Sequence, residues 1–157
     1  MKRSIAVTLL TLVLLCACTP IPTDDVQPLS LSYRGVELTV GMAADEVMAQ
    51  LGNDYTMSEA ESCAGQGMDR MYRYPSVQLY VFAPLHGEAR ITSVSYTDDG
   101  VQSAQGVRIG CSAVDVIAAM GQADEESETR LIYRGKESVL TIGLRDGVVV
   151  SVVLSGE

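Results

Sequence analysis

Two stretches of the chain align with each other without a gap, and this internal similarity restricts the fold more than any other feature of the sequence. Val40–Gly52 (VGMAADEVMAQLG) aligns with Ile109–Gly121 (IGCSAVDVIAAMG), with glycine at the second and last positions of both. Two shorter matches keep the same order and similar spacing: Met71–Tyr74 with Arg130–Tyr133, and Ile91–Tyr96 with Val149–Leu154. Because chance rarely produces three matches in register, the sequence predicts a tandem duplication.

The longer match predicts one short helix in each repeat. Apolar residues recur at helical spacing in both segments. In the second, Ser112 and Asp115 form a pair like a capping box, and Gly121 suits the left-handed residue that ends a helix. In the first, Gly52 ends the helix in the same way, but Ala43 replaces the serine, so we expect a weaker N-cap there.

After each predicted helix the apolar period changes from 3.6 to 2. Leu79–Ala83 and Leu140–Leu144 alternate like half-buried strands, and each leads through a turn into a final strand; Asp146-Gly147 is a strong hairpin signal. The expected fold class is α+β, with two tandem repeats at residues 29–100 and 101–157 in one compact unit. Each repeat would be a short helix packed on an antiparallel β-meander, and the sheet would keep one open face.

The N-terminal residues are typical of a bacterial lipoprotein signal peptide. Lys2 and Arg3 precede an apolar run that is too short to cross a membrane, since a spanning helix needs about 20 residues. The run ends in Leu-Cys-Ala-Cys, which resembles a lipobox and predicts removal of residues 1–17 and lipid attachment to Cys18. Two acyl chains suffice for stable anchoring. Residues 18–28, with three prolines, are expected to form a flexible tether.

The predicted location is the extracytoplasmic face of the cell membrane, through the lipid on Cys18. Thr19 follows the lipidated cysteine, at the position where an aspartate would retain a lipoprotein at the inner membrane. In a Gram-negative host, threonine at this position would therefore imply the outer membrane. Removal of residues 1–17 takes away two basic residues and no acidic residue, so the net charge changes from −9 to −11. Such an acidic domain is not expected to bind nucleic acid, whose binding proteins carry basic patches.

The repeat pattern is similar to that of known families. A Gly-Met or Gly-Cys step, a short helix ending in Leu-Gly or Met-Gly, and a meander cover most of residues 35–155. They resemble the tandem modules of β-lactamase-inhibitor-like proteins and the single module of the SmpA/OmlA (BamE-like) outer-membrane assembly lipoproteins. Ser62-Cys63 followed by Gly67–Tyr74 is similar to uncharacterised lipoproteins of Gram-positive anaerobes. The resemblance implies a fold rather than an activity, and no inhibitor loop carries over residue by residue.

Two cysteines remain beyond Cys18. In an exported protein an even pair, here Cys63 and Cys111, indicates a disulfide, which would tie the first repeat to the second. A pair of redox-active thiols is the competing interpretation, and the lack of a Cys-x-x-Cys motif disfavours it.

Catalytic and metal-binding patterns are weak. The only histidine, His86, lies in a predicted hairpin turn beside Gly87, where an exposed turn residue is expected rather than a base or ligand. The acidic clusters match no calcium loop, so no cofactor, no metal site and no enzymatic activity are predicted.

The remaining hypothesis is recognition through a surface. If Leu79 and Val81 face the helices, the open face carries these residues: Arg73, Tyr80, Phe82, Ser93 and Ser95. Exposed aromatic residues beside an arginine are typical of binding surfaces. A shift of one residue would instead place Tyr80 and Phe82 in the core, and the sequence leaves both arrangements open.

Two functions are therefore compatible with the sequence. The first is a lipid-anchored module that binds an unidentified protein, as an inhibitor, an adaptor or an envelope-assembly partner. The second is a lipoprotein that senses a small molecule or peptide, for which a closed apolar pocket would be expected.

Overall fold

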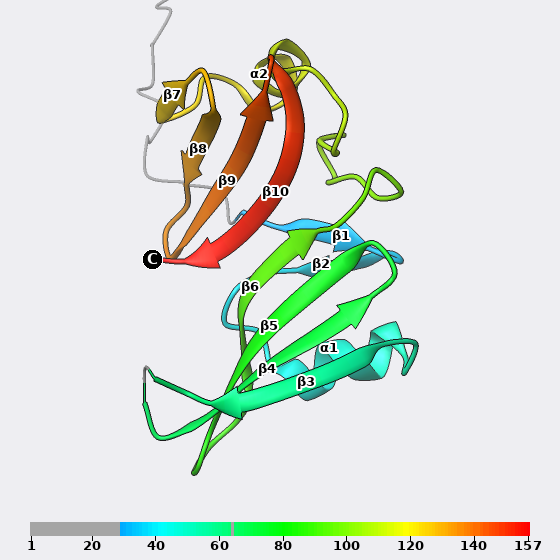
Figure 1. Ribbon diagram of the computed structural model, residues 1–157, viewed down its shortest axis with the longest axis vertical. Helices are drawn as coiled ribbons and strands as arrows, with labels where there is room; N and C mark the ends of the chain where they lie inside the picture. Colours follow the sequence, from blue (N-terminus) through cyan, green and yellow to red (C-terminus); the bar gives the residue numbers. More distant parts are fainter. Residues whose placement is uncertain (1–28, 64) are drawn as a thin grey trace, which may run out of the picture.

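The computed structural model describes residues 29–63 and 65–157, which form ten strands and two short helices (Figure 1). In chain order these are β1 (Leu31–Tyr33), β2 (Val36–Leu38), α1 (Ala44–Leu51), β3 (Thr56–Glu61), β4 (Gly67–Tyr74), β5 (Val77–Pro84), β6 (Arg90–Tyr96), α2 (Ala113–Met120), β7 (Glu125–Ser127), β8 (Arg130–Arg134), β9 (Ser138–Arg145) and β10 (Val148–Gly156). The predicted signal peptide, Cys18 and the tether lie outside the described residues. Within the described ranges, none of the helices has the length and apolar character needed to cross a membrane.

Eight of the described strands form one antiparallel sheet in the order β3-β4-β5-β6-β10-β9-β8-β7. β6 and β10 form the junction at its centre, where Tyr96 lies opposite Val152 and Ser93 opposite Ser155. β1 and β2 form a separate two-stranded sheet. β10, the last of the described strands along the chain, is therefore a central strand of the sheet.

The predicted fold class is wrong. The described residues are mainly β, with two helices of eight residues each, and they do not form an α+β protein of two tandem helix-on-meander repeats. As outer strands of separate meanders, β6 and β10 would each leave a row of backbone N–H and C=O groups unpaired, so they pair with each other and form one continuous sheet. The hairpin of β1 and β2 was also not predicted.

Several local expectations for the helices are confirmed. Ser112 Oγ accepts a hydrogen bond from the backbone N–H of Asp115 at 3.1 Å and donates one to the Asp115 carboxylate at 2.7 Å. Ala43 at the start of α1 gives no side-chain cap. Both helices end at the expected glycines, Gly52 and Gly121, whose φ angles of 80° and 86° are strained for other residues.

Backbone hydrogen bonds fix the approach of each helix to the sheet. The N–H of Gly41 donates to the carbonyl of Ile91 in β6 at 2.8 Å, and the N–H of Gly110 donates to the carbonyl of Val149 in β10 at 2.8 Å. The segment before each helix is thus bonded to one of the two strands at the central junction.

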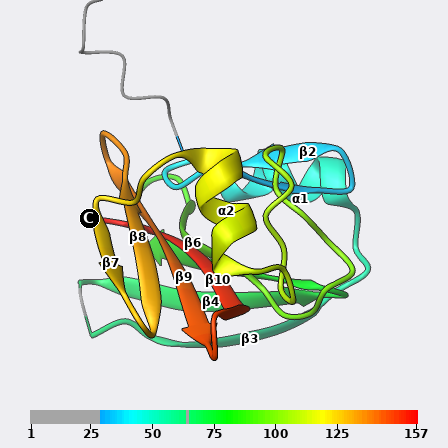
Figure 2. The same ribbon diagram turned by 90° about the horizontal axis from the view of Figure 1, so that it is seen from above.

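Both helices and the small sheet of β1 and β2 lie on the same side of the large sheet (Figure 2). The apolar side chains on this inner face are buried, among them Leu79, Val81, Leu140, Ile142 and Leu154. In β9 and β10 buried residues alternate with less buried ones, as expected for strands with one face in the core. The layer of helices and β1-β2 therefore covers the core, and among the described residues no element covers the opposite face.

Candidate binding surface

The side-chain direction of β5 decides which residues are available on the uncovered face. Leu79 and Val81 are each 1% exposed and point into the core, whereas Tyr80 between them is 42% exposed. Of the two arrangements that the sequence left open, the structure therefore has the one with Tyr80 on the open face.

The register of the sheet brings the five predicted residues to this one face. Tyr80 lies opposite Met71 in β4 and Ser93 in β6. In the next row, Gln78 lies opposite Arg73 in β4 and Ser95 in β6. Phe82 is two residues beyond Tyr80 on the same strand and so shares its face.

These residues differ in how much of each is accessible. Arg73 is exposed, while Phe82, Ser93 and Ser95 are half-buried. Gly65 of the β3–β4 loop lies against the Phe82 ring, since a Cβ built on it would be 3.4 Å from Cζ. Phe82 is therefore partly covered by the loop, and Tyr80 is the principal accessible aromatic residue of the five.

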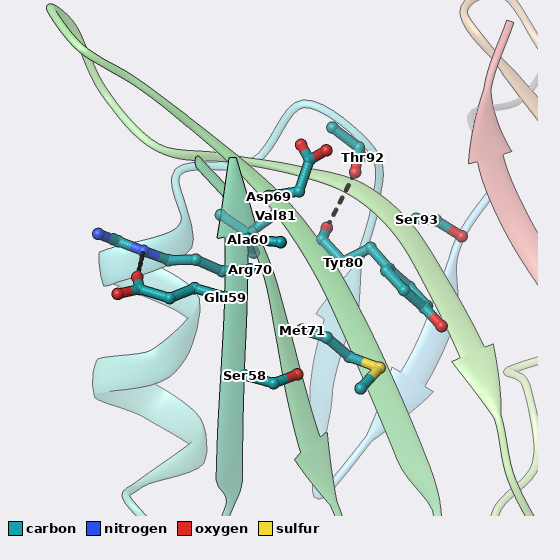
Figure 3. Close-up of a pocket in the computed structure, with 10 residues that line it drawn as sticks. All are labelled: Ser58, Glu59, Ala60, Asp69, Arg70, Met71, Tyr80, Val81, Thr92 and Ser93. Carbon is teal, nitrogen blue, oxygen red and sulfur yellow. Dashed lines mark hydrogen bonds and ion pairs between the residues drawn. The ribbon is translucent and has the colours of Figure 1, made fainter. Parts of the chain in front are cut away.

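A shallow hollow of about 820 Å³ lies over β3, β4, β5 and β6 beside Tyr80 (Figure 3). Its lining consists of Ser58, Glu59, Ala60, Asp69, Arg70, Met71, Tyr80, Val81, Thr92 and Ser93. In Figure 3 the side chains of Met71 and Tyr80 point to the same side of the sheet, whereas those of Glu59 and Arg70 point toward the side of the helix. The floor of the hollow therefore consists of short side chains on β3 next to the longer Met71 and Tyr80.

The chemical character of the hollow is mixed. Met71 and the Tyr80 ring give apolar contact area, and the hydroxyls of Ser58 and Ser93 and the Asp69 carboxylate give polar groups at its margin. Thr92 Oγ1 donates to the carbonyl of Tyr80 at 3.2 Å and so is bonded within the sheet. In the described part of the chain, no group of three or more His, Cys, Asp or Glu residues is placed to hold a metal ion.

Two polar contacts fix arginines near the hollow. Arg70 Nε donates to Glu59 at 3.2 Å on the helix side, and this hydrogen bond raises the pKa of Arg70. With its amide oxygen turned toward Arg73, Gln78 accepts hydrogen bonds from Nε at 2.8 Å and from Nη2 at 3.1 Å. The Arg73 guanidinium is thus held over the open face, with its position set by its cross-strand neighbour.

The predicted disulfide is not formed, because Cys63 and Cys111 are both free thiols. Cys63 is exposed in the β3–β4 loop, and Cys111 precedes α2, where its Sγ donates to the carbonyl of Arg108 at 2.9 Å. In Figure 1 this loop and α2 lie at opposite ends of the molecule. His86 is exposed in the connection between β5 and β6, as the turn prediction expected.

Sequence reasoning missed the part of the hollow that β3 and β4 provide. Ser58, Ala60, Asp69 and Met71 were not predicted as site residues. β3 has the sequence TMSEAE, which lacks the apolar alternation that identifies a strand. The alternation of Met71 and Arg73 with Tyr72 and Tyr74 was a usable signal, because it places Met71 on the face of Arg73.

Comparisons with known proteins found a similarity to a solved structure. The chain is similar to the uncharacterized protein yfeY from Escherichia coli, known from a crystal structure, with a TM-score of 0.46 and 11% sequence identity over 76% of this chain and 96% of that chain. No family model matches the chain, and no curated protein is significantly similar to it.

Proposed function

We propose that this protein is a lipid-anchored extracytoplasmic module that binds another protein through the open face around Tyr80. The observation that carries the proposal is the exposure of Tyr80, at 42%, beside a hollow on a sheet face that no described element covers. A large aromatic ring left in solvent next to apolar and polar side chains is typical of residues that dominate binding energy.

The composition around Tyr80 supports a protein partner. Met71 adds a flexible apolar side chain, which adapts to different partner shapes. Arg73, held by Gln78, and Asp69 add one charge of each sign at the margin. An aromatic and methionine centre with charged residues around it is the usual anatomy of a protein interface.

Membrane anchoring is supported by the sequence. Lys2 and Arg3, the short apolar run and the lipobox ending at Cys18 are typical of an exported lipoprotein. The described chain begins two residues before β1, which pairs with β2 in the layer opposite the open face (Figure 2). An anchor on that side would leave the face around Tyr80 available. An inhibitor, an adaptor and an envelope-assembly partner are the roles that fit the families the sequence resembles.

Binding of a small molecule is the second candidate, and the size of the hollow favours it. Ligand pockets typically have volumes of about 300–1,000 Å³, and the hollow has about 820 Å³. Its shallow shape argues against this candidate, because a small ligand gains affinity by being enclosed on most of its surface.

The test is a crosslinking pull-down of the full-length lipidated protein from its own cells. The double substitution Tyr80→Ala, Phe82→Ala would be compared with the wild type and with Val148→Ala, Val150→Ala, which removes two side chains that are each 41% exposed on β10. We expect a specific protein that is captured by the wild type and by the β10 control but not by the first variant. Absence of any specific protein, with folded and membrane-bound bait, would contradict the proposal.

A further inference from the structure

β3 is an exposed edge of the large sheet. All six of its residues are exposed, and among the described residues no strand pairs with its outer side. β7 at the other edge has three residues, so β3 is the longer of the two edges. An edge strand of this length can accept an added strand from another chain.

The hydrogen bonds to β4 show which backbone groups of β3 point outward. The N–H of Ser62 donates to the carbonyl of Gly67, directly across the hairpin, at 3.0 Å. In an antiparallel pair, residues that bond inward alternate with residues whose N–H and C=O point away. Counting back from Ser62, the outward groups belong to Met57, Glu59 and Glu61. These three residues form a continuous row of donors and acceptors.

The two sides of β3 differ in character. On the open face Ser58 and Ala60 are small, so the hollow beside Met71 continues to the edge of the sheet. On the helix side lie Met57, which is 49% exposed, Glu59 and Glu61. Glu59 is bonded to Arg70, while Glu61 makes no ion pair with any described residue.

We propose that β3 binds an extended segment of a protein partner as an added strand, and that this segment alternates basic with apolar side chains. Basic side chains on the helix side would lie beside Glu59 and Glu61, with their aliphatic stems against Met57. Apolar side chains on the open face would lie over Ser58 and Ala60 and reach toward Met71. The inference rests on the proposed protein-binding function and specifies the chemistry of the partner.

Charge complementarity selects this occupant over a second copy of the same chain. If two copies of β3 paired antiparallel through their outward backbone groups, centred on Glu59, then Glu59 would lie opposite Glu59 of the other copy and Met57 opposite Glu61. Like charges directly opposite each other destabilise a strand pair, and acidic residues on an edge oppose self-association. A partner strand with lysine or arginine opposite Glu59 and Glu61 would instead stabilise the pairing.

The direct test uses short synthetic peptides in which lysine and valine alternate, with the full chain as target. Hydrogen exchange of individual backbone amides is measured by NMR. We expect protection at Met57, Glu59 and Glu61, whose N–H groups would become bonded, and little change at Ser58 and Ala60, which already bond to β4. A peptide of the same composition with lysines and valines in separate blocks, and one with glutamate in place of lysine, should give no protection. Absence of protection with the alternating peptide would overturn the proposal.

Substitutions on β3 make the test specific. Glu59→Pro removes one outward N–H without removing a bond to β4, while Glu59→Gln keeps this N–H; we expect the affinity of the alternating peptide to fall about tenfold further for the proline variant. Glu61→Lys reverses a charge at the edge and should weaken binding, whereas Glu137→Lys makes the same change at an exposed site in the β8–β9 turn and should not. Equal effects of Glu61→Lys and Glu137→Lys would show attraction by net charge alone and would refute the proposed edge site.

The pull-down separates failure of this inference from failure of the proposed function. A partner that is lost on substitution of Tyr80 and Phe82 but retained by Glu59→Pro and Glu61→Lys would leave the protein-binding function standing and refute strand addition. Absence of a partner with every variant and with the wild type would refute both. Loss of the same partner with Glu59→Pro but not with Glu59→Gln would support strand addition, provided that thermal unfolding shows both variants to be folded.

Discussion

The hydroxyl of Tyr74 donates a hydrogen bond to the carbonyl oxygen of Gly52 at 2.9 Å. Tyr74 is the last residue of β4, and Gly52 is the residue that ends α1, so this bond links the helix to the second strand that follows it. Tyr133 in β8 makes the equivalent bond to Gly121 after α2, at 3.0 Å. Each helix end, which leaves backbone carbonyls without intrahelical partners, is thus bonded to a buried phenol.

Removing either phenol hydroxyl should destabilise the protein. We expect Tyr74→Phe and Tyr133→Phe each to lower the free energy of unfolding by about 1 kcal/mol, because each leaves a helix-end carbonyl with one partner fewer. Urea denaturation measures the change. Tyr80→Phe is the matched control, since no hydrogen bond involves its hydroxyl among the described residues, and it should leave the free energy of unfolding unchanged. An equal loss in the control would contradict this account.

The buried tyrosines should also make the protein sensitive to alkaline pH. Burial raises the pKa of Tyr74 from 10.0 to about 12, and burial likewise raises the pKa values of Tyr96 and Tyr133. The folded state favours the protonated phenol, so this stability is fully present below the unfolded pKa near 10 and is lost as the pH rises through about 12. Urea denaturation across this window should show a falling free energy of unfolding, with a smaller slope for Tyr74→Phe. An identical slope in that variant would exclude Tyr74 as a cause.

The two helix starts predict opposite responses to substitution. Ser112→Ala should lower the free energy of unfolding by about 1 kcal/mol, because the side-chain cap to the Asp115 N–H is lost. Ala43 has extended φ and ψ angles, and Glu46 lies three residues later, so Ala43→Ser should create a capping box and raise stability by about 0.5 kcal/mol. Thermal and urea denaturation of both variants provide the comparison, and destabilisation by Ala43→Ser would show that the site cannot hold the serine rotamer.

The side-chain direction of β5 predicts that substitutions at two neighbouring residues differ in their cost to stability. Leu79→Ala should cost roughly 2–5 kcal/mol, since it leaves a cavity in the core. Tyr80→Ala should cost about 1 kcal/mol or less, because it removes an exposed cross-strand neighbour of Met71 and Ser93. The two denaturation midpoints are compared. A larger loss for Tyr80→Ala than for Leu79→Ala would contradict the assigned side-chain direction of β5.

The free thiols predict that stability does not depend on reducing agent. An exposed Cys63 should react rapidly with a thiol reagent in the folded protein, and the half-buried Cys111 should react more slowly. Mass spectrometry after alkylation distinguishes the two sites. Protein purified from an oxidising compartment in which neither thiol reacts, and whose midpoint falls on reduction, would show that the two cysteines are bonded after all.

Local signals in the sequence identified local structure correctly. Gly52, Gly121, Ser112 and Ala43 behave as their residue types require, because helix caps depend on groups within one turn. The turn at Asp146-Gly147 likewise has the positive φ angles, 52° and 73°, that its sequence indicates. These features needed no information from the rest of the chain.

The sheet as a whole could not be predicted from such signals. Pairing of β6 with β10 depends on the unmet backbone groups of two strands that are distant in the sequence, and no residue type marks that pairing. β3 is polar and exposed on both sides, so its membership of the sheet has no apolar period. The candidate surface was therefore predicted only in part. Alternation identified its residues on β5 and β6, whereas Ser58 and Ala60 on β3 belong to it through a strand pairing that the sequence does not reveal.

The position of β10 has a consequence for the folding of this chain during its synthesis. β10, which follows the other described strands in the chain, lies between β6 and β9, so the two halves of the sheet share no strand pairing until β10 has been made. Because synthesis runs from the N-terminus, β1 to β9 leave the ribosome before the strand that joins them. During that interval β6 and β9 each present an open edge, and these intermediates are the stage at which chaperone binding or misassembly would act.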